Sequence, residues 1–183
     1  MLGLFSCNLK TRYLDNNKTR VPTDNQVFGN RSLFNSDVLK GIDTDVIYEE
    51  IYGYLSQKDN FIPLGKQKNY NTQMQAGYYR FYENGCVNFF ILEKDFNATQ
   101  QERNINPEYD GSRGVLYQKE GTRKVDLFAI KSYGLKPNYD IITRIIEIKG
   151  DSLFEKSMKD PNSVRVYAKR KLSPMASAFT ADW

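Results

Sequence analysis

Three segments of the chain share one pattern, in which two runs of apolar and aromatic residues flank a very short turn. The turns are Asn84-Gly85, Glu120-Gly121 and Gly150-Asp151, within residues 76–93, 114–131 and 139–157. Asn-Gly is typical of a two-residue type I′ turn, in which both residues take a positive φ. The pattern therefore predicts three β-hairpins that follow one another along the chain.

Two further segments are candidates for single strands on either side of this series. They are VIYEEIYGYL at residues 46–55, where a short helix is an alternative, and VRVYAKRKL at residues 164–172. About eight strands joined mainly by short turns predict an all-β fold, an antiparallel meander. Closing the meander removes exposed edges, so we expect a barrel or, in its less closed form, a strongly curved open sheet.

Alternation along the expected strands separates a mainly apolar face from a more polar one. In the last strand this alternation groups Val164 with Val166 and places Arg165 on the opposite face. A small barrel either encloses one small molecule or fills its interior with side chains. The same apolar positions would line a cavity in the first case and form the core, the default for large aromatics, in the second: Tyr79, Phe81, Phe89, Leu127 and Ile146.

The chain divides into three zones by composition. Residues 1–41 hold a short apolar stub and a polar stretch with no sustained hydrophobic period, so we expect a tether or a loosely packed arm. Residues 42–172 carry the strand pattern and form the expected β domain. Residues 173–183 are a short C-terminal tail.

The composition argues against common catalytic chemistry. The chain has no histidine, so the commonest general base is absent. It has two cysteines, which cannot form a zinc site by themselves. A carboxylate-only hydrolase stays open, but nothing nominates its two carboxylates. We therefore predict no catalytic residues, no metal and no cofactor.

One of the cysteines, Cys7, follows the residues Leu4-Phe5-Ser6. This stretch resembles the box that ends bacterial lipoprotein signals, where the cysteine is acylated and becomes the mature N-terminus. Phe5 departs from the box, and Met1–Ser6 lacks the charge and length of a signal. Two interpretations stay open: a lipid anchor at Cys7 that holds the protein on a bilayer, or an incidental thiol in a cytoplasmic protein.

The β region resembles the small lipocalin-like domains of bacterial lipoproteins. The resemblance rests on YYRFYENGCV, IEIKGDSLF and VRVYAKRKL, and it covers roughly residues 42–172. It implies a lipocalin-like barrel or half-barrel that is secreted and tethered, and it carries no catalytic signature.

The last strand is basic and contains an aromatic residue. Arg165, Lys169 and Arg170 with Tyr167 could contact a nucleic acid. Lysine and arginine on an edge strand also block unwanted pairing between sheets, and this is the interpretation we favour.

Together these features predict a non-catalytic cell-envelope lipoprotein with a binding or structural role, anchored through Cys7, with a small apolar molecule as one candidate ligand. The alternative is a soluble β-barrel module that binds a nucleic acid or protein through its basic last strand.

Overall fold

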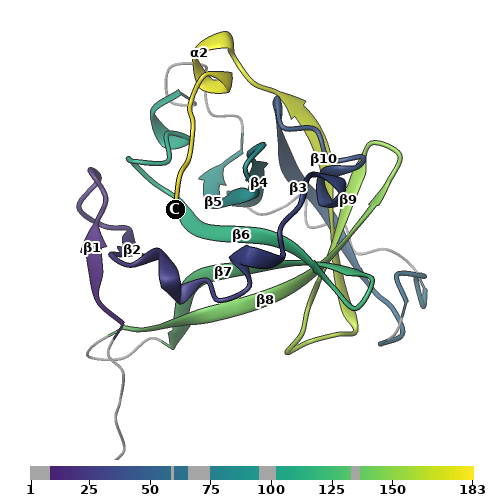
Figure 1. Cartoon of the computed structure of the whole chain (residues 1–183). Helices are drawn as coiled ribbons and strands as arrows, with labels where there is room; N and C mark the ends of the chain where they lie inside the picture. Colours follow the sequence, from purple (N-terminus) through teal and green to yellow (C-terminus); the bar gives the residue numbers. More distant parts are fainter. Residues whose placement is uncertain (1–8, 59, 66–74, 95–101, 133–136) are drawn as a thin grey trace, which may run out of the picture.

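The computed structural model describes residues 9–58, 60–65, 75–94, 102–132 and 137–183. Eight antiparallel strands close into a barrel in the order β10-β3-β4-β5-β6-β7-β8-β9 (Figure 1). The predicted all-β antiparallel meander is thus confirmed in its closed form. The strands are β3 (Val46–Leu55), β4 (Gln75–Phe81), β5 (Cys86–Glu93), β6 (Ser112–Lys119), β7 (Thr122–Ser132), β8 (Asn138–Lys149), β9 (Ser152–Ser157) and β10 (Ser163–Lys171).

The three predicted hairpin turns, β4–β5, β6–β7 and β8–β9, lie together at one end of the barrel. Glu120 and Gly121 both have a positive φ, as a type I′ turn requires, while in the β8–β9 turn Gly150 has a φ of 58°. The β4–β5 turn differs from the expected type I′, because Asn84 is not in the left-handed region and Gly85 alone has a φ of 80°. Gly85 N donates to Tyr82 O at 2.9 Å and Tyr82 N to Cys86 O at 3.0 Å, which makes a longer turn that ends on Gly85.

Residues 9–41, here called the N-terminal arm, pack against the barrel instead of forming the expected loose tether. Leu14, Val21, Phe28 and Val38 are all at most 2 % exposed. The arm holds a two-stranded sheet and three short 3-10 helices: β1 (Thr11–Tyr13), β2 (Arg20–Pro22), η1 (Asn25–Val27), η2 (Arg31–Leu33) and η3 (Ser36–Leu39).

The last part of the arm closes the turn end of the barrel. Val38 and Ile42 belong to the main core, and Phe34 packs against it. Phe34 also sits so close to Gly85 that a Cβ there would lie 2.4 Å from its ring. Arg123 Nη2 donates to Lys40 O at 2.7 Å, which ties the arm to the β6–β7 hairpin. This end is therefore filled with side chains, and we call the other end the mouth.

Residues 173–183, the C-terminal segment, run across the outside of the barrel and finish beside β6 (Figure 1). They begin with the short helix α2 (Pro174–Ser177), whose first turn is capped by Ser173 Oγ accepting from Ala176 N at 3.1 Å. Ala176 and Trp183 are both at most 1 % exposed. The expected tail is thus a covering layer over β4, β5 and β6.

Candidate functional site

The five residues predicted to line a ligand cavity or form the core come together inside the barrel. Tyr79, Phe81, Leu127 and Ile146 belong to one buried cluster, and Phe89 packs against it. Tyr79, Phe89 and Leu127 also line a cavity of about 470 Å³ near the mouth. The interior therefore combines both arrangements: a packed core toward the turn end and open space toward the mouth.

The cavity has apolar walls above a polar floor. Phe89, Leu127, Ala129 and Ile142 contribute the walls from β5, β7 and β8. Its volume falls in the lower half of the range of about 300–1,000 Å³ that is usual for small-molecule sites. A molecule that fits must be small and must present apolar surface to the walls.

Glu155 is the centre of the polar floor, which we define as Glu155, Tyr79, Tyr167 and Arg144. Glu155 is 3 % exposed, and its Oε2 accepts hydrogen bonds from the hydroxyls of Tyr79 and Tyr167, both at 2.8 Å. Its Oε1 lies 3.5 Å from Nε of Arg144. Burial of a carboxylate is costly unless it is paired and hydrogen-bonded, and these three neighbours meet that need.

The two tyrosines of the floor act as permanent donors. Burial, followed by the nearby charge of Glu155, raises the pKa of Tyr79 and of Tyr167 well above the ordinary tyrosine value. Both hydroxyls therefore stay protonated at neutral pH. Their protons point at Glu155 Oε2, so toward a bound molecule the floor presents the hydroxyl lone pairs and the guanidinium of Arg144.

A side opening joins this floor between β3 and β4, where only Tyr48 and Glu49 pair with β4. A second cavity of about 300 Å³ lies there and shares Phe89 and Arg165 with the first. Arg165 Nη1 is 3.9 Å from Oε2 of Glu50, and burial raises the pKa of the Glu50 carboxyl. Gly77 makes room at this point, because a Cβ there would lie 2.9 Å from both Glu50 and Phe89.

The polar floor was missed at the sequence level, although one signal for it exists. Arg144 shares the parity of Ile146 in β8, and Glu155 shares that of Leu153 in β9. Strict alternation therefore places both charged residues on the core face. This placement was not predicted, because charged residues were expected to face solvent.

The predicted grouping of β10 is observed, with Val164 and Val166 on one face and Arg165 on the other, but the face of Arg165 is the one that lies inside the barrel. Register shifts between Val166 and Tyr167 where β10 pairs with β3. Tyr167 reaches the interior core, whereas Val164 and Val166 join a separate cluster with Tyr54. The outer face of β10 is thus apolar and covered, and Arg165 faces the cavity.

The basic residues predicted for the last strand do not gather on one surface. Arg165 lines the cavity and approaches Glu50. Lys169 donates to Asp151 at 3.2 Å, and Arg170 donates to Glu49 at 3.0 Å. Each cation therefore has a carboxylate neighbour, which does not favour the nucleic-acid alternative.

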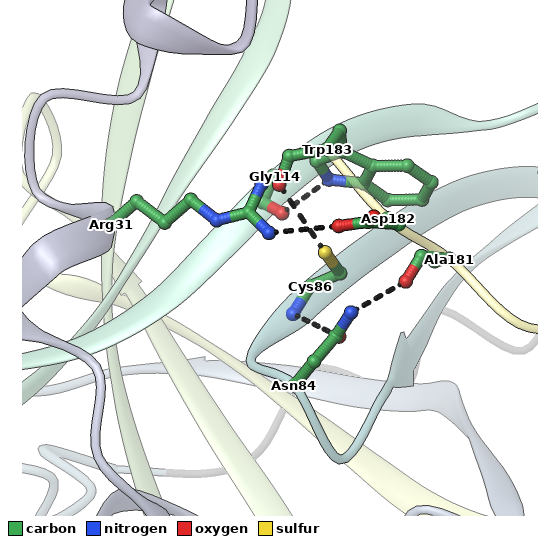
Figure 2. Close-up of polar contacts among 7 residues, drawn as sticks. All are labelled: Arg31, Asn84, Cys86, Gly114, Ala181, Asp182 and Trp183. Atoms are coloured by element: carbon green, nitrogen blue, oxygen red, sulfur yellow. Dashed lines mark hydrogen bonds and ion pairs between the residues drawn. The ribbon is translucent and has the colours of Figure 1, made fainter.

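The C-terminal segment is held on the barrel by a set of polar contacts that Figure 2 shows. Trp183 Nε1 donates to Gly114 O at 2.8 Å, and Asn84 Nδ2 donates to Ala181 O at 2.6 Å. Arg31 of the arm forms an ion pair with Asp182 at 3.0 Å. Arm, barrel and C-terminal segment are therefore joined at one place.

Cys86 lies beneath this contact as a free, buried cysteine. Its Sγ donates to Trp183 O at 3.4 Å, and burial raises the pKa of the thiol. Both effects suit a structural role. Cys7, the predicted lipidation site, lies outside the described residues.

Comparison of the chain with protein-family models, with curated proteins and with solved structures gives no significant match. Within the described ranges, no helix has the length and apolar character needed to cross a membrane, and no group of three or more acidic, cysteine or histidine residues could hold a metal ion.

Proposed function

We propose that the protein is a non-catalytic binding protein that holds a small amphipathic molecule in the mouth end of its barrel. The observation that carries this proposal is the combination of apolar walls with a buried polar floor in one cavity of about 470 Å³. A barrel stabilised by packing alone has no need for a charged carboxylate and an arginine inside it, since burying them is costly.

The arrangement of the floor supports binding more than catalysis. Glu155 Oε2 is already occupied by two tyrosine hydroxyls, whose protons are firmly held. A general base needs a free lone pair within reach of a substrate proton. A carboxylate that already accepts two firmly held protons is a weaker base toward a substrate, which favours binding over proton transfer.

We further propose that the protein works in the cell envelope, as a lipoprotein with a lipocalin-like domain that is attached to the bilayer through an acylated Cys7. The sequence Leu4-Phe5-Ser6-Cys7 supports this placement. The mass of the protein from native membranes, expressed with its upstream frame, tests it: an acyl mass on Cys7 supports the anchor, and an unmodified chain in the soluble fraction contradicts it.

The binding proposal is tested with a fluorescent apolar probe whose emission rises on transfer from water. Ala129 lines the cavity, so Ala129→Trp should fill it and reduce probe binding at least about tenfold, while the far-ultraviolet circular dichroism stays unchanged. Lys119→Trp, at the exposed end of β6, adds the same ring outside the cavity and serves as the control. Equal loss in both variants, or no binding by the wild type, would contradict the proposal.

A further inference from the structure

The cavity walls carry more positive than negative charge. Four basic and two acidic side chains line the space: Lys18, Arg20, Arg144, Arg165, Asp110 and Glu155. Including the side opening adds one acid, Glu50, and the basic residues remain in excess. A concave site with apolar walls concentrates such a field and favours an anion.

The acids of the cavity are already engaged by other donors. Glu155 accepts from two tyrosines and faces Arg144. Asp110 accepts from the hydroxyl of Thr19 and from Gly111 N at 2.7 Å. Both carboxylates are therefore already stabilised by hydrogen bonds or a cation within the protein.

The two arginines near the floor are less completely engaged than the acids. Arg144 donates no hydrogen bond to any residue in the described part of the chain, and its carboxylate neighbour is 3.5 Å away. Arg165 Nη1 lies 3.9 Å from Glu50, beyond hydrogen-bond distance, and its other polar neighbours are the Tyr167 hydroxyl and Glu155, which leave part of its donor fork unused. A guanidinium carries five N–H donors in a planar fork that matches an oxyanion, so both groups have donors to offer.

We propose that the ligand is a single-tailed amphiphile whose oxyanion head group binds Arg144 and Arg165, with its tail along Phe89, Leu127 and Ile142 toward the mouth. This inference rests on the proposed function and specifies its ligand class. The apolar walls accept the tail, and the modest volume limits it to one chain.

The test is calorimetric titration of the full chain with four probes of equal tail length, each below its aggregation concentration: dodecanoate, dodecyl phosphate, dodecanol and dodecyltrimethylammonium. We expect an anion to bind at least about tenfold more tightly than the alcohol, and the cation most weakly, because charge-assisted hydrogen bonds form only with an anionic head. The ratio of the affinities for dodecanoate and dodecyl phosphate distinguishes a carboxylate site from a phosphate site.

Variants identify the residues responsible. Arg144→Gln and Arg165→Gln should each weaken the anion by roughly ten- to a hundredfold and leave dodecanol almost unchanged. Arg165 is 45 % exposed, so its variant stays foldable even if Arg144→Gln does not. Lys169→Gln removes a cation of the same strand that does not line the cavity, and it should behave as wild type.

The outcomes separate the two proposals. If dodecanol binds as tightly as both anions, the head-group inference is wrong while the proposed function stands. The same holds if the arginine variants weaken the binding of an anion and of dodecanol equally. If none of the four probes binds, the proposed function itself fails.

Discussion

At the scale of single residues, two glycines show how the barrel and the arm depend on each other. Gly85 and Gly121 both end or form a hairpin turn with a positive φ, at 80° and 74°. Gly85 is in contact with Phe34, whereas nothing lies within 4 Å of the position that a Cβ would take at Gly121. The same substitution at the two sites therefore separates backbone strain from packing against the arm.

We expect Gly121→Ala to lower the free energy of unfolding by about 1–2 kcal/mol, the cost of the left-handed conformation. Gly85→Ala should cost about 1–3 kcal/mol more, because the added methyl group overlaps the Phe34 ring. Urea titration of both variants measures the difference. Equal losses would show that the arm does not press on this turn.

The hydroxyl of Tyr167 gives a second prediction at this scale. Tyr167→Phe removes one of the two donors to the buried Glu155 and should lower stability by about 1–3 kcal/mol. Tyr109→Phe is the control, since the Tyr109 hydroxyl has no hydrogen bond within the described residues, and we expect a change within about 0.5 kcal/mol. An unchanged free energy of unfolding in Tyr167→Phe would mean that Glu155 does not need this hydrogen bond.

At the scale of elements, the positions of the barrel strands were predictable from the sequence. The inner face of β10 and the packing of the N-terminal arm were not. Short turns and aromatic runs predicted all eight strands of the barrel, because local turn chemistry and alternation determine a hairpin. Which face of β10 lies inside was not predictable, because the interior takes the face of Arg165 and Tyr167, while a separate outer cluster covers the two valines.

The close packing of the N-terminal arm was not predicted, for a different reason. Its apolar residues, Leu14, Val21, Phe28 and Val38, lie far apart in a polar segment, so no window of sequence carries a period. They are buried because the barrel supplies the surface that the arm itself lacks. Segments whose order comes from contact with another element are inherently hard to recognise from local composition.

A matched pair of leucines tests whether the arm is part of the fold. Leu14 is 1 % exposed and Leu33 is 41 % exposed, and both belong to the arm. Leu14→Ala should cost about 2–5 kcal/mol, as for other buried leucines, and Leu33→Ala should stay within about 0.5 kcal/mol. Denaturant unfolding distinguishes this from a free tether, for which neither variant would change stability.

At the scale of the whole molecule, the arm and the C-terminal segment behave as one structure with the barrel. One contact network joins residues from all three parts of the chain (Figure 2): Arg31, Cys86, Gly114, Asp182 and Trp183. Phe28 of the arm belongs to the same buried cluster as Trp183. Loss of any of the three parts should therefore weaken the other two.

The single tryptophan makes this cooperativity measurable. Trp183 is 1 % exposed and reports on the C-terminal segment, while far-ultraviolet circular dichroism reports on the barrel. We expect the two signals to change at the same denaturant concentration, as in a two-state transition. An earlier fluorescence transition would show that the segment detaches from a folded barrel.

Cys86 reports on the same contact through its chemistry. Burial raises the pKa of its thiol, so at pH 8 less thiolate is present than for a free cysteine, and the reaction with an aromatic disulfide reagent should be slow. In a Cys7→Ser background, Trp183→Ala should speed this reaction by about tenfold or more, since it removes the largest side chain from the buried cluster that contains Cys86. An unchanged rate would mean that other residues protect Cys86.

The filled turn end of the barrel has a kinetic consequence. Phe34, Val38 and Ile42 occupy that end, so under the proposed function a molecule reaches and leaves the cavity through the mouth or through the side opening, and not through the turn end. Each route serves entry and departure alike, so a change at its rim that lowers the barrier for entry lowers the barrier for departure equally. Under the proposed function, evolution of the rim adjusts how fast the cavity exchanges its contents, while the affinity is set by the polar floor and Arg165.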